Sequence, residues 1–119
     1  MEGAHSVTTT PAARVAGMGA ALPAGRETVT EIEDRIERES GGLPVPRGTL
    51  AAISGIETRH AVGPGEYAST LAARAASCAL EDARVPLADI ALLLFASTSS
   101  DQVEPATVHN VAHELGYRG

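Results

Sequence analysis

The sequence has no tryptophan, no lysine, one cysteine and only three aromatic residues, two Tyr and one Phe. A single cysteine cannot form an internal disulfide, which excludes a secreted scaffold held together by disulfide bonds. Without lysine, all nine basic residues are arginines, and fifteen acidic residues give a net charge of −6 at pH 7. Because no basic cluster is present, this balance argues against nucleic acid or an anionic lipid surface as the main partner.

Long apolar runs are also missing. The longest run, Ile90 to Ala96, is far too short to span a bilayer. The N-terminus lacks the basic region followed by an apolar stretch that marks a signal peptide. We therefore expect a soluble, cytoplasmic chain with no membrane span. With so few aromatic residues, the core depends on Leu, Ile and Val, and 119 residues of this composition predict an incomplete core.

Apolar periodicity and turn residues divide the chain into alternating extended and helical elements. After a flexible tail over residues 1–12, the patterns predict strands or extended segments at Arg14–Ala21, Gly55–Val62 and Ile90–Ala96. They predict helices at Thr30–Glu39, Arg47–Ser54 and Tyr67–Ala83, and a last helix from Pro105 to a stop at Gly116. The continuous apolar run at 90–96 suits a strand covered on both faces of a parallel sheet. This order favours an α/β fold with too few strands to enclose that strand.

Three motifs resemble functional sites, but plainer interpretations fit them better. The Gly17-x-Gly19 motif lacks the third glycine of a dinucleotide-binding turn, and a proline follows where a helix should begin, so tight backbone packing is favoured. Cys78 stands among alanines in the middle of a predicted helix, which favours a small buried side chain over a nucleophile. His109 and His113 share a helix face, but a metal site needs a third ligand, and we expect no metal.

The helix predicted at Thr30–Glu39 is rich in charge. Its acidic residues alternate with Arg35 and Arg38. This pattern is typical of a solvated helix face. The acidic residues of that face are Glu31, Glu33, Asp34, Glu37 and Glu39.

Glu104 is the most informative single residue. It follows a polar loop after the strand predicted at 90–96 and stands directly before Pro105. Ligand sites in α/β folds gather at the carboxyl ends of strands, which is where this loop begins. A carboxylate there also suits a helix N-terminus, so a cap or helix-dipole role is the alternative interpretation.

Several segments form an ordered set that is more specific than any one of them. The segments are RVAGMGAALP at 14–23, SGIETRH at 54–60, the alanine-rich helix at 71–83, DIALLLFAST at 89–98 and Pro-Ala-Thr at 105–107. In register and in order, they resemble the N-terminal part of the thiolase-superfamily condensing enzymes of the ketoacyl synthase III type. The connection LPVPRGTL at 43–50 and the glutamate before Pro105 resemble the OleA-like branch, which joins two acyl-CoA thioesters. The resemblance covers residues 13–119 and implies the N-terminal part of a thiolase fold with αβαβα layers, incomplete as it stands.

The resemblance also implies a reaction. In the complete enzyme, an acyl group passes from coenzyme A or acyl carrier protein to a Cys beyond residue 119, and a second acyl thioester attacks it in a Claisen condensation. Glu104 is implied as the catalytic base, reaching into the partner subunit of a homodimer. The Trp and Arg with which the fatty-acid-type synthases hold coenzyme A are missing around residues 49–53.

The resemblance implies no permanently bound cofactor, because the coenzyme A or carrier-protein thioester is the substrate. It implies one required partner, the remaining C-terminal part of the enzyme, on the same chain or a separate one. The 119-residue chain alone is therefore expected to be inactive. The alternative hypothesis is a non-catalytic, thiolase-like interaction subunit.

Overall fold

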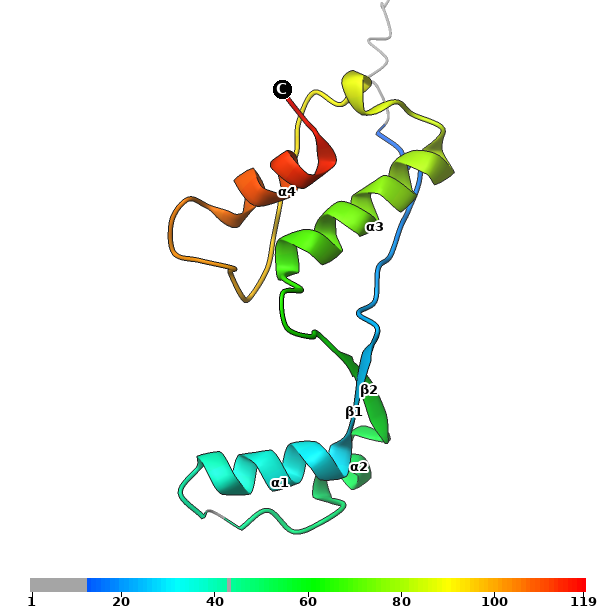
Figure 1. Cartoon of the computed structure of the whole chain (residues 1–119). Helices are drawn as coiled ribbons and strands as arrows, with labels where there is room; N and C mark the ends of the chain where they lie inside the picture. The colour runs from blue at the N-terminus through cyan, green and yellow to red at the C-terminus, as the bar shows by residue number, and fades with distance from the viewer. Residues whose placement is uncertain (1–12, 43) are drawn as a thin grey trace, which may run out of the picture.

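The computed structural model describes residues 13–42 and 44–119. The tail predicted over residues 1–12 lies outside the described residues, as does Leu43 in the connection at 43–50. The described chain forms two groups of elements, one around a short antiparallel strand pair and one made by two packed helices (Figure 1). Residues 13–24 run along the longer helix of this pair and lead into the strand pair (Figure 1).

The first group contains β1 (Gly25–Thr28), α1 (Val29–Glu39), α2 (Thr49–Ser54) and β2 (Thr58–Ala61). The two strands are antiparallel, with Gly25 opposite Ala61. Helix α1 starts at the end of β1 because Thr28 and Glu31 form a reciprocal capping box. The predictions for α1, α2 and the strand within Gly55–Val62 are confirmed.

The second group contains α3 (Ala68–Ala83), a short 3₁₀ turn η1 (Leu87–Asp89) and α4 (Thr107–Leu115). Helices α3 and α4 lie side by side, and Ala73 and Val111 are buried. The helix predicted at Tyr67–Ala83 is confirmed, and Gly116 ends α4 in the left-handed conformation, as expected.

Two predicted strands are not strands in this chain. Arg14–Ala21 and Ile90–Ala96 are extended but pair with no strand of the described residues. The expectation that Ile90–Ala96 is buried on both faces is also wrong here, because Leu92 is 70 % and Leu94 82 % exposed. The physical reason is that a strand needs hydrogen-bonding neighbours, and β1 and β2 pair only with each other.

The charged face of α1 holds one exception to the solvated pattern. Glu33 is 2 % exposed, so the prediction of a solvated side chain is wrong at this position. Its carboxylate accepts hydrogen bonds from the backbone N–H groups of Gly48 and Leu50, at 2.8 and 2.9 Å. These two donors belong to the start of α2, so Glu33 joins α2 to α1 and satisfies backbone groups that the helix leaves unpaired.

Candidate functional site

Glu104 lies in the polar loop between the extended segment at 90–96 and α4. Its side chain is exposed, and within residues 13–42 and 44–119 it makes no hydrogen bond or ion pair. The Glu104–Pro105 peptide bond is cis. A carboxylate that the described chain leaves unpaired is available as an acceptor or a base for a group brought from elsewhere.

Glu104 does not cap α4. The helix begins at Thr107, its N-cap Ala106 makes no side-chain cap bond, and the first turn contains no acidic residue. The cap interpretation is therefore wrong, and so is the expectation that Pro105 occupies the first turn. The reason is that Ala106 has extended backbone angles, φ −55° and ψ 137°, so the helix starts after both residues. A helix-dipole role for Glu104, two residues before the N-cap, stays a prediction.

Asp101 connects the loop to both helices of the pair. One carboxylate oxygen accepts a hydrogen bond from the Ser69 N–H at 3.3 Å, and the other accepts from the Asn110 side-chain amide at 3.4 Å. The Asp101 N–H donates to the Thr107 hydroxyl at 3.2 Å. The Ser69 side chain and backbone, together with Asn110, hold the pKa of Asp101 below its ordinary value of 3.8.

A second carboxylate, that of Glu114, also binds the start of α3. Glu114 on α4 accepts hydrogen bonds from the hydroxyls of Ser69 at 3.0 Å and Thr70 at 3.2 Å. Ser69 is 2 % exposed, so its hydroxyl and its N–H are both paired inside the protein. The start of α3 is thus tied to α4 directly through Glu114 and to the loop through Asp101.

The structure also tests the interpretations of the glycine pair, Cys78 and the two histidines. At Gly17 and Gly19 the chain passes so close to α3 that an added Cβ would overlap its backbone, which confirms the close-packing interpretation. Cys78 is exposed, so the expectation of a buried side chain is wrong, because this residue lies on a face of α3 that the described chain does not cover. Around His109 and His113, no group of three metal-ligating side chains exists among the described residues.

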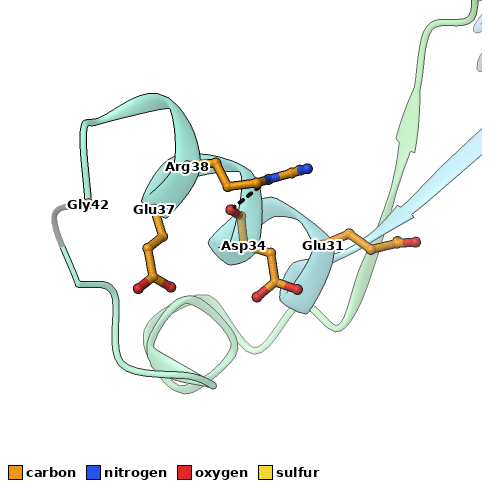
Figure 2. Close-up of a pocket in the computed structure, with 5 residues that line it drawn as sticks. All are labelled: Glu31, Asp34, Glu37, Arg38 and Gly42. Carbon is orange, nitrogen blue, oxygen red and sulfur yellow. Dashed lines mark hydrogen bonds between the residues drawn. The ribbon is translucent and has the colours of Figure 1, made fainter.

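A hollow of about 710 Å³ lies beside α1 and is lined by acidic side chains. Figure 2 shows Glu31, Asp34, Glu37 and Arg38 extending from α1 in more than one direction rather than converging on a point. Arg38 donates to the backbone oxygen of Asp34, whose carboxylate pairs with Arg47 at 2.8 Å. Diverging, partly paired charges on one helix do not form a catalytic constellation.

An apolar cavity of about 350 Å³ lies beside α3. Val15 and Gly17 line one side, Ile90 and Leu93 line another, and the alanine-rich face of α3, including Ala79, forms the floor. Exposed apolar surface of this kind is typical of protein interaction surfaces and ligand-binding grooves. In the described part of the chain, none of the helices has the length and apolarity needed to cross a membrane.

The sequence patterns assigned no role to Asp101, Ser69 or Glu114, and they placed Glu33 on a solvated helix face. A signal existed at Asp101, because an aspartate after a run of serines at the end of an extended segment commonly bonds to nearby backbone. Nothing local marked the other three, since their partners are 15 to 45 residues away in the sequence.

Comparisons with known proteins give relatives and solved structures of one enzyme group. No family model matches the chain. It is 44 % identical over 115 residues to a 3-oxopimeloyl-[acyl-carrier-protein] synthase of Rhodothermus marinus, covering 95 % of this chain and 32 % of that protein. It is 36 % identical over 104 residues to a beta-ketoacyl-[acyl-carrier-protein] synthase III of Rhodospirillum rubrum, covering 87 % of this chain and 30 % of that protein. The chain thus spans about a third of the length of these relatives.

Solved structures give the same answer for the fold. A variant of OleA from Xanthomonas campestris superposes with a TM-score of 0.72 at 31 % identity, over 87 % of this chain and 31 % of that one. The described residues therefore form part of a thiolase fold. The chain belongs to the thiolase superfamily, and within it to the group that contains ketoacyl synthase III and OleA.

Proposed function

We propose that the chain is the N-terminal segment of an acyltransferase that joins two acyl thioesters by a Claisen-type condensation. The observation that carries the proposal is the 44 % identity, over almost the whole chain, to a synthase whose name describes a 3-oxoacyl product. The substrate class follows from the same comparisons. Two relatives are named as acyl-carrier-protein synthases, and one OleA structure contains lauric acid and lauroyl-CoA.

The nucleophile in this proposal is a cysteine beyond residue 119. Cys78 is the sole cysteine of the sequence and lies within α3, so the proposal gives it no part in the chemistry. The 119 residues supply scaffold and the loop that carries Glu104, and alone they have no turnover. The cavity beside α3 is where we expect the remainder of the enzyme to pack, because apolar side chains line it and continue along residues 90–96.

Glu104 is the base of the second half-reaction. In the first half-reaction, the cysteine thiolate attacks an acyl thioester, and the coenzyme A or carrier sulfur leaves as a thiolate. Glu104 then takes a proton from the α carbon of a second acyl thioester, and the resulting carbanion attacks the acyl-cysteine carbonyl. A carbon–carbon bond forms, the carbon–sulfur bond to the cysteine breaks, and the proton stays on the carboxyl group. Its exposure and its lack of a partner in the described chain support a role in the site of a second subunit.

The test separates the two half-reactions in the complete enzyme. Glu104→Gln should leave acylation of the cysteine unchanged, measured by intact mass, and should lower the condensation rate about 10²- to 10⁴-fold. Glu39→Gln, at the exposed end of α1, is the matched control and should change neither rate. Normal condensation by the Glu104→Gln enzyme would exclude Glu104 as the base. If no assembled form acylates a cysteine, the chain is instead a non-catalytic interaction subunit.

Mixed dimers test whether Glu104 acts across the interface. One subunit carries Glu104→Gln with an intact cysteine, and the other carries Glu104 with the cysteine replaced. If Glu104 serves the partner's site, one site of the mixed dimer holds both groups, and condensation returns to about half that of the unmodified dimer. If Glu104 serves its own subunit, no site is complete, and the mixed dimer stays inactive.

A further inference from the structure

The loop that carries Glu104 is closed by a hydrogen bond between its two ends. The N–H of Asp101 donates to the hydroxyl of Thr107 at 3.2 Å, and Glu104 stands three residues from each. Thr107 is 5 % exposed, so this bond lies inside the protein rather than in water. Glu104 is therefore at the tip of a loop whose base is fixed.

The base of the loop is also fixed to the helix pair. The carboxylate of Asp101 bridges the N–H of Ser69 on α3 and the side-chain amide of Asn110 on α4. Ser69 is 2 % exposed, and its hydroxyl is held in turn by Glu114. One side chain thus joins three parts of the protein: the loop, the start of α3 and the first turn of α4.

Glu104 itself has no such support within the described residues. The direction of its carboxylate is set by the backbone that carries it, and that backbone is held at Asp101 and Thr107. A catalytic base must meet its proton in a narrow range of positions, and a displacement of about 1 Å can cost about a hundredfold in rate. Because the two ends of the loop are fixed, the backbone at Glu104 can keep its position although the side chain is exposed.

We propose that Asp101 is a positioning residue, which through its bonds to Ser69, Asn110 and Thr107 holds the Glu104 loop in the orientation that condensation requires. The inference rests on the proposed function of Glu104. It assigns Asp101 no contact with substrate. A positioning role differs from a purely structural one in its effect on the two half-reactions. Loss of Asp101 should impair only the condensation step, which uses Glu104, whereas loss of fold stability would impair cysteine acylation as well.

The experiment compares Asp101→Ala and Asp101→Asn in the complete enzyme. Asp101→Ala should lower kcat for condensation about ten- to hundredfold while cysteine acylation keeps its rate. Asp101→Asn should recover most of the loss, since its oxygen can still accept from Ser69 and the Asn110 amide can turn to offer its own oxygen. Asp89→Ala, which removes an exposed carboxylate outside this network, is the matched control and should change neither rate.

A double-mutant cycle with Glu104→Gln completes the test. If Asp101 acts through Glu104, Asp101→Ala costs nothing further once Glu104 is Gln. Independent, multiplicative losses would overturn the inference, as would an equal loss of acylation, or a loss in Asp101→Asn as large as in Asp101→Ala. Failure of the proposed function looks different, because then Glu104→Gln alone condenses normally. If Glu104→Gln is impaired and Asp101→Ala is not, only the positioning role is refuted.

Discussion

Gly19 is the position at which the structure makes its sharpest stability prediction. A Cβ added there would stand 2.2 Å from the Ala75 carbonyl oxygen, 2.4 Å from the Ala79 nitrogen and 2.9 Å from the Cys78 carbonyl carbon. All three atoms belong to the backbone of α3, so no side chain can rotate away. Gly19→Ala must therefore push the extended segment off the helix.

The size of the effect follows from that displacement. An ordinary contact begins near 3.4 Å, so the segment must retreat by about 1.2 Å at its closest point. Overpacking of this kind costs about 1–3 kcal/mol, and rigid backbone places Gly19→Ala at the upper end, about 3 kcal/mol. The Met18 N–H, which donates to the Asp82 carboxylate at 3.0 Å, moves with the segment and weakens the same attachment.

The assay is urea unfolding of the complete enzyme, followed by circular dichroism. Gly63→Ala is the matched control, because a Cβ at Gly63 meets nothing within 4 Å. That control should change the free energy of unfolding by no more than about 0.5 kcal/mol. A Gly19→Ala enzyme as stable as the control would refute the close approach of residues 13–24 to α3.

Three further predictions concern single residues. Hydrogen bonds from the backbone N–H groups of Leu50 and Gly48 lower the pKa of Glu33 from 4.5. The stability that its carboxylate contributes is therefore complete above pH 4.5 and is lost as the pH falls through the lower pKa of the folded state. Glu33→Gln should make the free energy of unfolding depend less on pH in that acid range, while Glu37→Gln, at an exposed position, should not. Thr28→Ala should cost about 1 kcal/mol in unfolding, and Thr28→Ser should restore it. Leu94→Ala should leave helix content unchanged in the 119-residue chain, where Leu94 is 82 % exposed, yet cost about 2–5 kcal/mol in the complete enzyme.

The helices could be predicted because their signals are local. The apolar spacing in Tyr67–Ala83 and the glycine after Leu115 operate within a few residues, and both gave elements at the expected places. The same holds for the short strand within Gly55–Val62. Family resemblance, which needs only ordered segments, also identified the fold that the comparisons show.

The remaining features could not be predicted because they depend on distant partners. The run at 90–96 has the composition of a buried strand, but burial depends on neighbours, and the described chain pairs no strand with it. Glu33 reads as one more solvated acid until α2 folds back and supplies two N–H donors. Asp101 is likewise a surface aspartate in the sequence and becomes a bridge only when α3 and α4 meet.

Two exposed leucines and one unpaired carboxylate lie on consecutive parts of the described chain. Leu92 and Leu94 are exposed on an extended segment, and Glu104 lies in the loop that follows it. Within residues 13–42 and 44–119, the segment has no strand partner and the Glu104 carboxylate has no ionic partner. Water is a poor environment for the leucines and a favourable one for the carboxylate, so the folding of this chain leaves only the exposure of the leucines unexplained. Packing against the rest of a thiolase-fold enzyme would bury the leucines, and the hydrogen bond from the Asp101 N–H to the Thr107 hydroxyl would hold the loop that carries Glu104. The apolar segment would then pack as scaffold, and it would also fix the position at which Glu104, the proposed catalytic base, emerges.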